Sequence, residues 1–311
     1  MLFRSVTKTF TVSFDAMSMK PEANGKIQFL VAGTTPSFTL SSGYSGLSVD
    51  WGDGTTDGTT SHTYTDGDSF HNVSVSVANC AEIKVESSKL YAFWSIGDNM
   101  QIVPASFRGY SNLQYVGSDI FKNFQGTDMS SRFTRCSKLK SIPSGLFDNC
   151  PNVTSFYDCF SFCSSLTEIP SGLFDNCPNV TDFRYCFGNC SSLTEIPSGL
   201  FDNCPNVTSF YYCFSNCSSL AAGFIPFAAL LKASYNFIYK SCSMLTKLIA
   251  NSETPVSINS SIPNNSGLKI YVPDSAIETY KTATNWSAFA DKIVGFSELT
   301  DEEKKKYGIT A

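Results

Sequence analysis

The chain has little charge and almost no histidine. Only 16% of its 311 residues are charged, two are histidines, and the formal net charge is −5. Basic residues cluster only at Lys304, Lys305 and Lys306, directly after three acidic residues. Because nucleic-acid binding requires a basic surface patch, this composition predicts no nucleic-acid partner.

The chain also lacks a long apolar segment. A membrane-spanning helix needs roughly 18 or more consecutive apolar residues, and no part of the sequence approaches that length. The opening residues alternate apolar and polar types, so they do not resemble a secretory signal. We therefore predict no membrane insertion, and export by the general route is not indicated.

Apolar and aromatic residues are abundant. Hydrophobic types make up 42% of the chain and include 26 phenylalanines and 14 tyrosines, which excludes disorder through low hydrophobicity. Since charges are scarce, the surface is expected to be rich in Ser, Thr, Asn and Tyr.

An internal repeat occupies the middle of the chain. The segment Cys-Pro-Asn-Val-Thr begins at Cys150, Cys177 and Cys204, a step of 27 residues each time. That period is typical of leucine-rich repeats. One copy is too small to bury its own apolar face, so the copies must stack as parallel coils with Phe, Leu and Ile inside.

The segments on either side of the repeats have different patterns. Residues 26–31, 46–51 and 72–77 alternate like half-buried strands between Gly and Asp turns, as in an antiparallel sandwich. Behind the repeats, residues 268–273 predict a strand, Asp274 or Ser275 can cap a helix, and a last helix is expected from Ser297 or Thr300. We predict a mainly β fold with a short sandwich (residues 1–80), a leucine-rich-repeat solenoid (81–265) and a small α/β cap with a terminal helix (266–311).

Two motifs carry a resemblance to known families. Each repeat resembles the BspA-like leucine-rich repeat, in which an Asn-Val-Thr strand precedes a Phe-x-x-Cys-x-x-Leu turn and strand. Upstream, Trp51-Gly52-Asp53-Gly54 resembles the turn of the polycystic-kidney-disease (PKD) domain, although this module is short. The combination is similar to surface proteins of anaerobic gut bacteria and of the phages that infect them, and it implies adhesion or display instead of a reaction.

The chain contains 12 cysteines, some of them spaced as Cys-x-x-x-Cys pairs such as Cys159 and Cys163. A zinc site needs four converging ligands, whereas equivalent cysteines of a stacked repeat lie along parallel ladders. We expect buried, reduced thiols. Disulfides within or between coils are the main alternative, and they would require an oxidising compartment.

Asp50, Asp53 and Asp57 could surround a calcium ion. The Asp-Gly steps are equally well explained as hairpin turns, and the six to eight or so oxygen ligands that calcium takes are not evident. We predict turns, no metal site and no cofactor. His62 is expected to close a local corner through a hydrogen bond.

The candidate binding residues are positions at which the three copies differ from one another. They fall on one strip outside the buried phenylalanines and carry Tyr, Arg, Asn and Ser. Rigid tyrosines among small polar residues favour binding, while drift of solvated positions after duplication explains the pattern equally well. The predicted binding residues are Tyr157, Asp158, Arg184, Tyr185, Tyr211 and Tyr212.

No paired carboxylates, activated nucleophile or phosphate loop has the spacing that catalysis requires, so we predict a non-catalytic recognition protein. Because a virion protein needs no export signal, we favour a phage head decoration, fibre or tail-associated protein that binds protein or carbohydrate on a host surface. The alternatives are a bacterial cell-surface adhesin and, more remotely, an enzyme on a repeat scaffold. The N-terminal module is expected to contact other virion or surface proteins within an oligomer or larger assembly.

Overall fold

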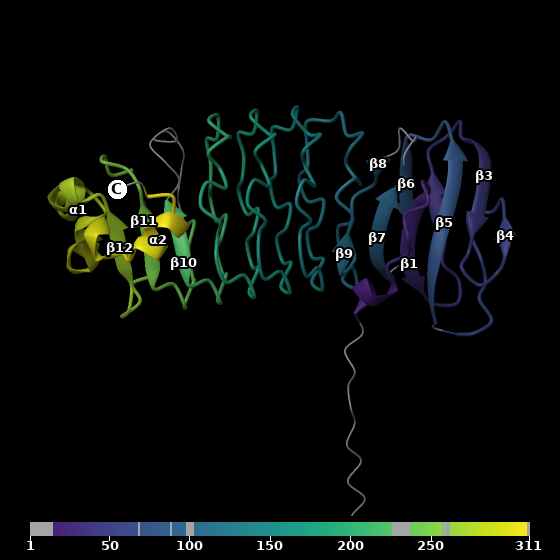
Figure 1. Cartoon of the computed structure of the whole chain (residues 1–311), viewed down its shortest axis with the longest axis horizontal. Helices are drawn as coiled ribbons and strands as arrows, with labels where there is room; N and C mark the ends of the chain where they lie inside the picture. Colours follow the sequence, from purple (N-terminus) through teal and green to yellow (C-terminus); the bar gives the residue numbers. More distant parts are fainter. Residues whose placement is uncertain are drawn as a thin grey trace, which may run out of the picture.

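The computed structural model describes residues 15–67, 69–87, 89–97, 103–225, 237–256, 258 and 262–309. The molecule is elongated, with β-sheets at one end, stacked coils in the middle and a small α/β cap at the other end (Figure 1). The order of parts and the mainly β character agree with the sequence prediction.

The N-terminal part consists of a six-stranded sheet, ordered β4-β3-β5-β1-β7-β9, and a three-stranded sheet, ordered β2-β6-β8. The strands are β1 (Ile27–Ala32), β2 (Phe38–Leu40), β3 (Ser45–Asp50), β4 (Thr56–Asp57), β5 (Phe70–Ala78), β6 (Glu82–Val85), β7 (Leu90–Ile96), β8 (Val103–Pro104) and β9 (Tyr115–Val116). Strands β1, β3 and β5 are those predicted from alternation. Strands β6, β7 and β8 follow residue 80, so the two sheets extend past the boundary predicted for this part.

Aromatic rings join the two sheets and then continue into the solenoid. Phe29 of β1 meets Phe38 of β2 edge-on, with ring centroids 5.9 Å apart, and stacks against Phe93 of β7 at 6.0 Å. Phe107 lies 5.5 Å from Phe93 and 5.4 Å from Phe133 of the first coils. Strand β7 also pairs in parallel with β9. The core therefore passes from sandwich to solenoid without a linker.

The coils are held together by ladders of buried phenylalanines. Successive rings are 6.0 Å apart from Phe147 to Phe174 and 5.4 Å apart from Phe160 to Phe187. The coils thus approach more closely on the Phe160 side. Backbone hydrogen bonds add to this contact, for example from Phe156 N to Asp182 O at 2.9 Å.

Regular strands are short within the coils because the backbone turns sharply there. The Asn-Val-Thr strand that the BspA-like resemblance implies is reduced to single bridges such as Ser155↔Asp182. Two residues with positive φ follow in each coil, four positions apart, and bulky L-residues rarely adopt this conformation. These pairs are Ser131 and Arg135, Asp158 and Phe162, Tyr185 and Asn189, Tyr212 and Asn216, and Phe237 and Ser241.

The cap continues the solenoid as a parallel sheet in the order β10-β11-β12-β13. Its elements are β10 (Ala222–Ile225), β11 (Lys247–Ala250), β12 (Lys269–Val272), η3 (Asp274–Ala276), α1 (Ile277–Thr282), η4 (Ser287–Lys292), β13 (Ile293–Gly295), η5 (Phe296–Glu298) and α2 (Asp301–Lys306). At the other end of the molecule, a short 3-10 helix, η1 (Ala16–Met19), precedes β1. Strand β12 matches the prediction at residues 268–273.

The two predicted helix starts had different outcomes. The expected cap by Asp274 or Ser275 is wrong, because no side chain caps α1. The Asp274 carboxylate instead accepts a hydrogen bond from Ser297 N at 3.1 Å, and Ser275 Oγ donates to the Glu253 carboxylate. The final helix is confirmed, and Thr300 forms a capping box with Glu303 at its start.

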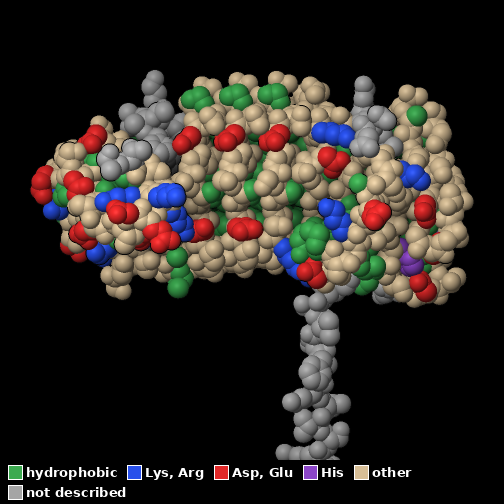
Figure 2. All heavy atoms as spheres, in the orientation of Figure 1, with side chains coloured by type: hydrophobic (Ala, Val, Ile, Leu, Met, Phe, Trp, Pro, Cys, Tyr) green, Lys and Arg blue, Asp and Glu red, His purple; other side chains and the backbone are tan. Residues whose placement is uncertain are grey.

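The C-terminal segment folds back over the sheet of the cap. Tyr307 packs edge-on against Phe224, with ring centroids 5.5 Å apart, and belongs to a small core with Ile249 and Tyr271. Lys306 Nζ lies 2.6 Å from Glu195 Oε2 in the repeats, on a face where acidic side chains recur along the coils (Figure 2). The segment therefore covers one side of the cap sheet and ties the cap to an earlier coil.

Replacing Phe183 with alanine tests the stacking model. This ring is fully buried and lies 4.7 Å from Phe174 and 4.8 Å from Phe201. The cavity should lower the free energy of unfolding by about 3 to 5 kcal/mol, measured by urea denaturation. Phe162→Ala is the matched control: that ring is 45% exposed, so the change should stay within about 0.5 kcal/mol. Equal losses in the two variants would contradict the model.

Candidate recognition surface

The predicted binding residues lie in two adjacent rows that run along the stack. Tyr157, Arg184 and Tyr211 occupy equivalent positions in successive coils, and Asp158, Tyr185 and Tyr212 occupy the next position. The second row continues to Phe237 in the following coil. We define the aromatic ridge as Tyr157, Arg184, Tyr185, Tyr211, Tyr212, Phe237 and Lys240.

The rings of the ridge form one continuous set of contacts. Tyr185 stacks on Tyr212 with centroids 5.1 Å apart and planes 3° apart, and Tyr212 stacks on Phe237 at 5.0 Å. The Tyr185 ring also meets Tyr211 edge-on, with centroids 5.7 Å apart, and meets Tyr157 edge-on at 6.0 Å. Tyr157 is 37% exposed and the other four rings are half-buried, so the edges of the ridge reach solvent.

Two cations lie over these rings. The guanidinium carbon of Arg184 is 5.2 Å from the ring centre of Tyr157, and Asp182 holds the guanidinium through a 2.7 Å ion pair. Lys240 Nζ is 5.3 Å from the ring centres of both Tyr212 and Phe237 and makes no ion pair with any described residue. Both arrangements are cation–π contacts. The ridge thus combines aromatic edges with accessible positive charge.

The backbone under the ridge is unusual for such residues. Tyr185, Tyr212 and Phe237 have φ angles of 57°, 56° and 56°. Glycine and asparagine are the residues favoured in this region, and in the second left-handed row of the same coils the chain has Asn189 and Asn216. Local conformation therefore does not explain why aromatic residues occupy the first row.

Asp158 differs from its neighbours in the ridge. Its carboxylate accepts hydrogen bonds from Ser131 Oγ at 3.3 Å and from Thr134 Oγ1 at 3.1 Å. Both donors belong to the preceding coil. Asp158 was predicted as a binding residue, and its carboxylate instead takes part in contacts between coils.

Phe237 and Lys240 extend the ridge beyond the residues predicted from sequence. The coil between Cys217 and Cys242 has 25 residues instead of 27, so a fixed period misses its equivalents. Aligning the two cysteines would have placed Phe237 beneath Tyr212.

The aspartates of the sandwich act within turns. Asp53 accepts from Thr55 N at 3.0 Å and from Thr55 Oγ1, and its other oxygen lies 2.8 Å from His62 Nε2. Hydrogen bonds from Thr55, followed by His62, hold the pKa of Asp53 well below its usual range. Asp57 accepts from Trp51 Nε1 at 3.0 Å. Gly52 and Gly54 have φ angles of 80° and 91°, as the hairpin interpretation requires.

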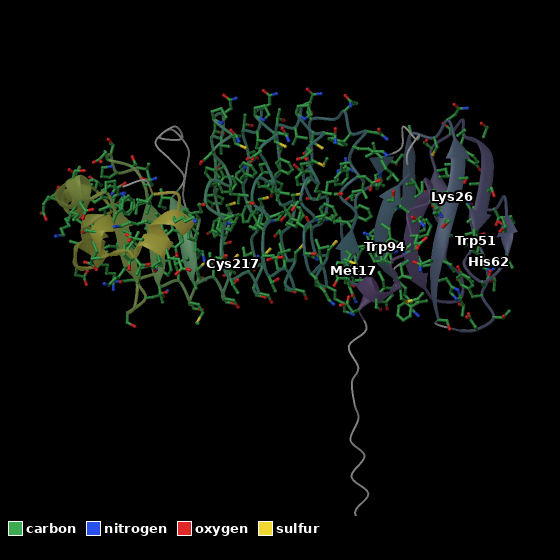
Figure 3. The ribbon with its side chains drawn as sticks, in the orientation of Figure 1. Met17, Lys26, Trp51, His62, Trp94 and Cys217 are labelled. Carbon is green, nitrogen blue, oxygen red and sulfur yellow. The ribbon has the colours of Figure 1, made fainter. Side chains whose placement is uncertain are left out.

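The expected corner at His62 is present. Its ring stacks on Trp51 with centroids 5.1 Å apart, and Tyr64 Oη donates to Trp51 O at 2.6 Å. Figure 3 labels Trp51 and His62 beside each other in the sandwich. Across the described part of the chain, no three His, Cys, Asp or Glu side chains are grouped so as to hold a metal ion.

The cysteines of the coils are buried and unpaired. The Sγ atoms of Cys163, Cys190 and Cys217 each donate to a phenylalanine carbonyl of the preceding coil at 3.2 Å. Burial raises the pKa of Cys136, Cys190 and Cys242 to about 12. Thiols with such high pKa values are poor nucleophiles at neutral pH, so their role in the coils is packing.

These features define a continuous stack of repeats with an aromatic ridge on its exterior, and comparisons with known proteins identify the family. The chain belongs to the BspA-type leucine-rich repeat family, whose model matches in six copies over residues 70–208 and 155–287. Among solved structures, a leucine-rich cell surface protein from Faecalibacterium prausnitzii A2-165 is 17% identical, with a TM-score of 0.22, and the match covers 76% of this chain and 88% of that one. No curated protein matches. None of the helices in the described ranges is long and apolar enough to cross a membrane.

Alkaline pH should destabilise the fold through the buried thiols. In the unfolded chain these thiols ionise near their ordinary pKa of 9.0, whereas Cys136, Cys190 and Cys242 in the folded chain ionise near 12. The unfolded state alone therefore loses protons between these values, so stability is full below pH 9 and falls as pH rises toward 12. Each thiol should contribute about 1.4 kcal/mol per pH unit, measured by urea denaturation from pH 8 to 11.

Matched variants separate this effect from the titration of lysines and tyrosines. Cys190→Ala should reduce the slope of stability against pH by the contribution of one thiol. Ser191→Ala, which removes a neighbouring group that does not ionise, should leave the slope unchanged. An unaltered slope in Cys190→Ala would show that its thiol ionises equally in both states.

Proposed function

We propose that this chain is a non-catalytic recognition protein at a bacterial cell surface and that the aromatic ridge is its contact surface. The observation that carries the proposal is the placement of Tyr185, Tyr212 and Phe237 at left-handed positions. A strained backbone is retained where the surrounding structure or function requires it, and such residues cluster at functional sites. Stacking between the rings offsets part of the strain.

The chemistry of the ridge suits the recognition of protein or carbohydrate. Tyrosine supplies a large amphipathic surface with few rotatable bonds, and Tyr and Arg are enriched among the residues that dominate binding energies. The side chains are held by one another and by rigid coils, so little conformational entropy remains to be lost on binding. Arg184 and Lys240 add donors for carboxylate or hydroxyl groups of the partner.

The cell-surface setting rests on the BspA-type repeats, which are typical of surface proteins. The same ridge would also suit a phage virion, but among the described residues no feature favours a virion over a cell surface, and none favours an enzyme. The N-terminal sandwich, with its PKD-like turn at Trp51 to Gly54, is proposed to contact other surface proteins and to position the solenoid within a larger assembly.

Substitutions in the ridge should weaken adhesion. We expect Tyr211→Ala and Arg184→Ala each to reduce binding of the purified chain to epithelial cells or a mucin-coated surface by about tenfold or more, because truncating a central contact residue commonly costs about 2 kcal/mol. Binding is measured by flow cytometry and biolayer interferometry.

An antibody against the chain should also label intact cells of the source organism.

The control is Tyr44→Ala, which removes an exposed tyrosine (41%) outside the ridge. It should bind like the parent chain, and all variants should retain the parent melting temperature within a few degrees. Full binding by a ridge double variant would refute the assignment of the ridge, and labelling only after cell lysis would refute the surface location.

A further inference from the structure

A shallow polar groove runs across four successive coils, next to the aromatic ridge. Its volume is about 550 Å³. Asn152, Asn179 and Asn206 form one row along it, and Thr127, Thr154 and Thr181 form the other. Ser155 and Phe156 separate Thr154 from Tyr157, so the Asn/Thr groove and the ridge lie side by side along each coil.

The side chains of the Asn/Thr groove are fixed in orientation by the neighbouring coil. Asn179 Nδ2 donates to Pro151 O at 2.9 Å, and Asn206 Nδ2 donates to Pro178 O at 3.0 Å. Thr154 Oγ1 donates to Thr127 O at 3.1 Å, and Thr181 Oγ1 donates to Thr154 O at 3.2 Å. These hydrogen bonds use one of the two N–H donors of each amide and the single O–H donor of each threonine, and so determine which atoms remain for a ligand.

The remaining hydrogen-bonding capacity consists mainly of acceptors. The amide oxygens of Asn179 and Asn206 accept no hydrogen bond from any described residue, and each threonine hydroxyl keeps its lone pairs. Every coil repeats this pattern. The groove therefore offers a ladder of outward-facing oxygens that complements a ligand with regularly repeated hydroxyl donors.

Charge and backbone pairing exclude two other classes of ligand. No Lys, Arg, Asp or Glu lines the groove, and nucleic acids depend on cations for most of their affinity. A peptide that adds as a strand needs unpaired backbone groups. Here Thr154 N already donates to Thr127 O and Thr181 N to Thr154 O, each at 2.8 Å.

We infer that the Asn/Thr groove binds an uncharged, linear polysaccharide that lies along the solenoid, with about one sugar unit facing each coil. Sugar hydroxyls donate to the asparagine oxygens, and the ridge flanks the chain with tyrosine edges. Because the sites repeat in register, contacts that are individually weak add up along one polymer. This inference rests on the proposed recognition function and names the ligand class for a second surface beside the ridge.

Neutral oligosaccharides of increasing length test the inference. We expect β-linked gluco- or manno-oligosaccharides to bind the full chain with an affinity that rises up to about four units, matching the four coils that line the groove, and then levels off. Binding is measured by calorimetry, and the parent polysaccharides are tested by affinity electrophoresis. Polygalacturonate and polyglutamate, which are acidic, should bind much more weakly.

Variants locate the site. Asn179→Ala and Asn206→Ala should each weaken binding of the longest oligosaccharide by about fivefold, as loss of one net hydrogen bond implies, and should lower the length at which affinity levels off. Asn203→Ala removes an exposed asparagine of the same coil that does not line the groove, and it should bind like the parent. Thermal unfolding checks that each variant is folded.

The outcomes distinguish this inference from the proposed function. Absence of binding to every neutral glycan, or equal losses in Asn203→Ala and Asn206→Ala, overturns the groove as a glycan site. If cell binding then still depends on Tyr211, the ridge proposal stands alone.

Discussion

The contact between one coil and the next is the constraint on which the rest of this structure depends. No coil buries its own apolar side chains, so stability comes from phenylalanine ladders and from backbone hydrogen bonds that link neighbouring coils. Phe183 touches rings in its own coil, the coil before and the coil after. Residues inside the ladders are consequently almost invariant among the copies, whereas residues outside them can differ.

The same constraint requires both ends of the stack to be covered. At the N-terminal end, β7 pairs with β9 and Phe107 extends the phenylalanine core into the sandwich. At the C-terminal end, the parallel sheet of the cap continues the coil pairing, and the segment that contains Tyr307 folds back across it. The outermost strand of the six-stranded sheet, β4, has only two residues, and very short edge strands limit edge-to-edge association.

Stacking also places surface residues in register, and the proposed recognition surface is built from this register. Side chains 27 residues apart become neighbours, so one Tyr per coil yields a row of contacting rings and one Asn per coil yields a row of oriented amides. Tyr185 and Tyr212 hold these contacts from left-handed backbone positions. A partner would therefore meet a rigid, preorganised surface instead of mobile loops, and binding would cost little conformational entropy.

The sequence by itself determined the repeat, the mainly β fold, the strands β1, β3, β5 and β12, and the final helix, because period, alternation and capping are local properties of the chain. It also identified the strip that varies between copies. Only the tertiary structure decided that β6 to β8 complete the sandwich, that Asp158 turns toward the preceding coil and that the Asn/Thr rows border a groove. Each of these depends on which residues become neighbours across coils or sheets, and sequence spacing does not encode the orientation of a side chain toward another coil.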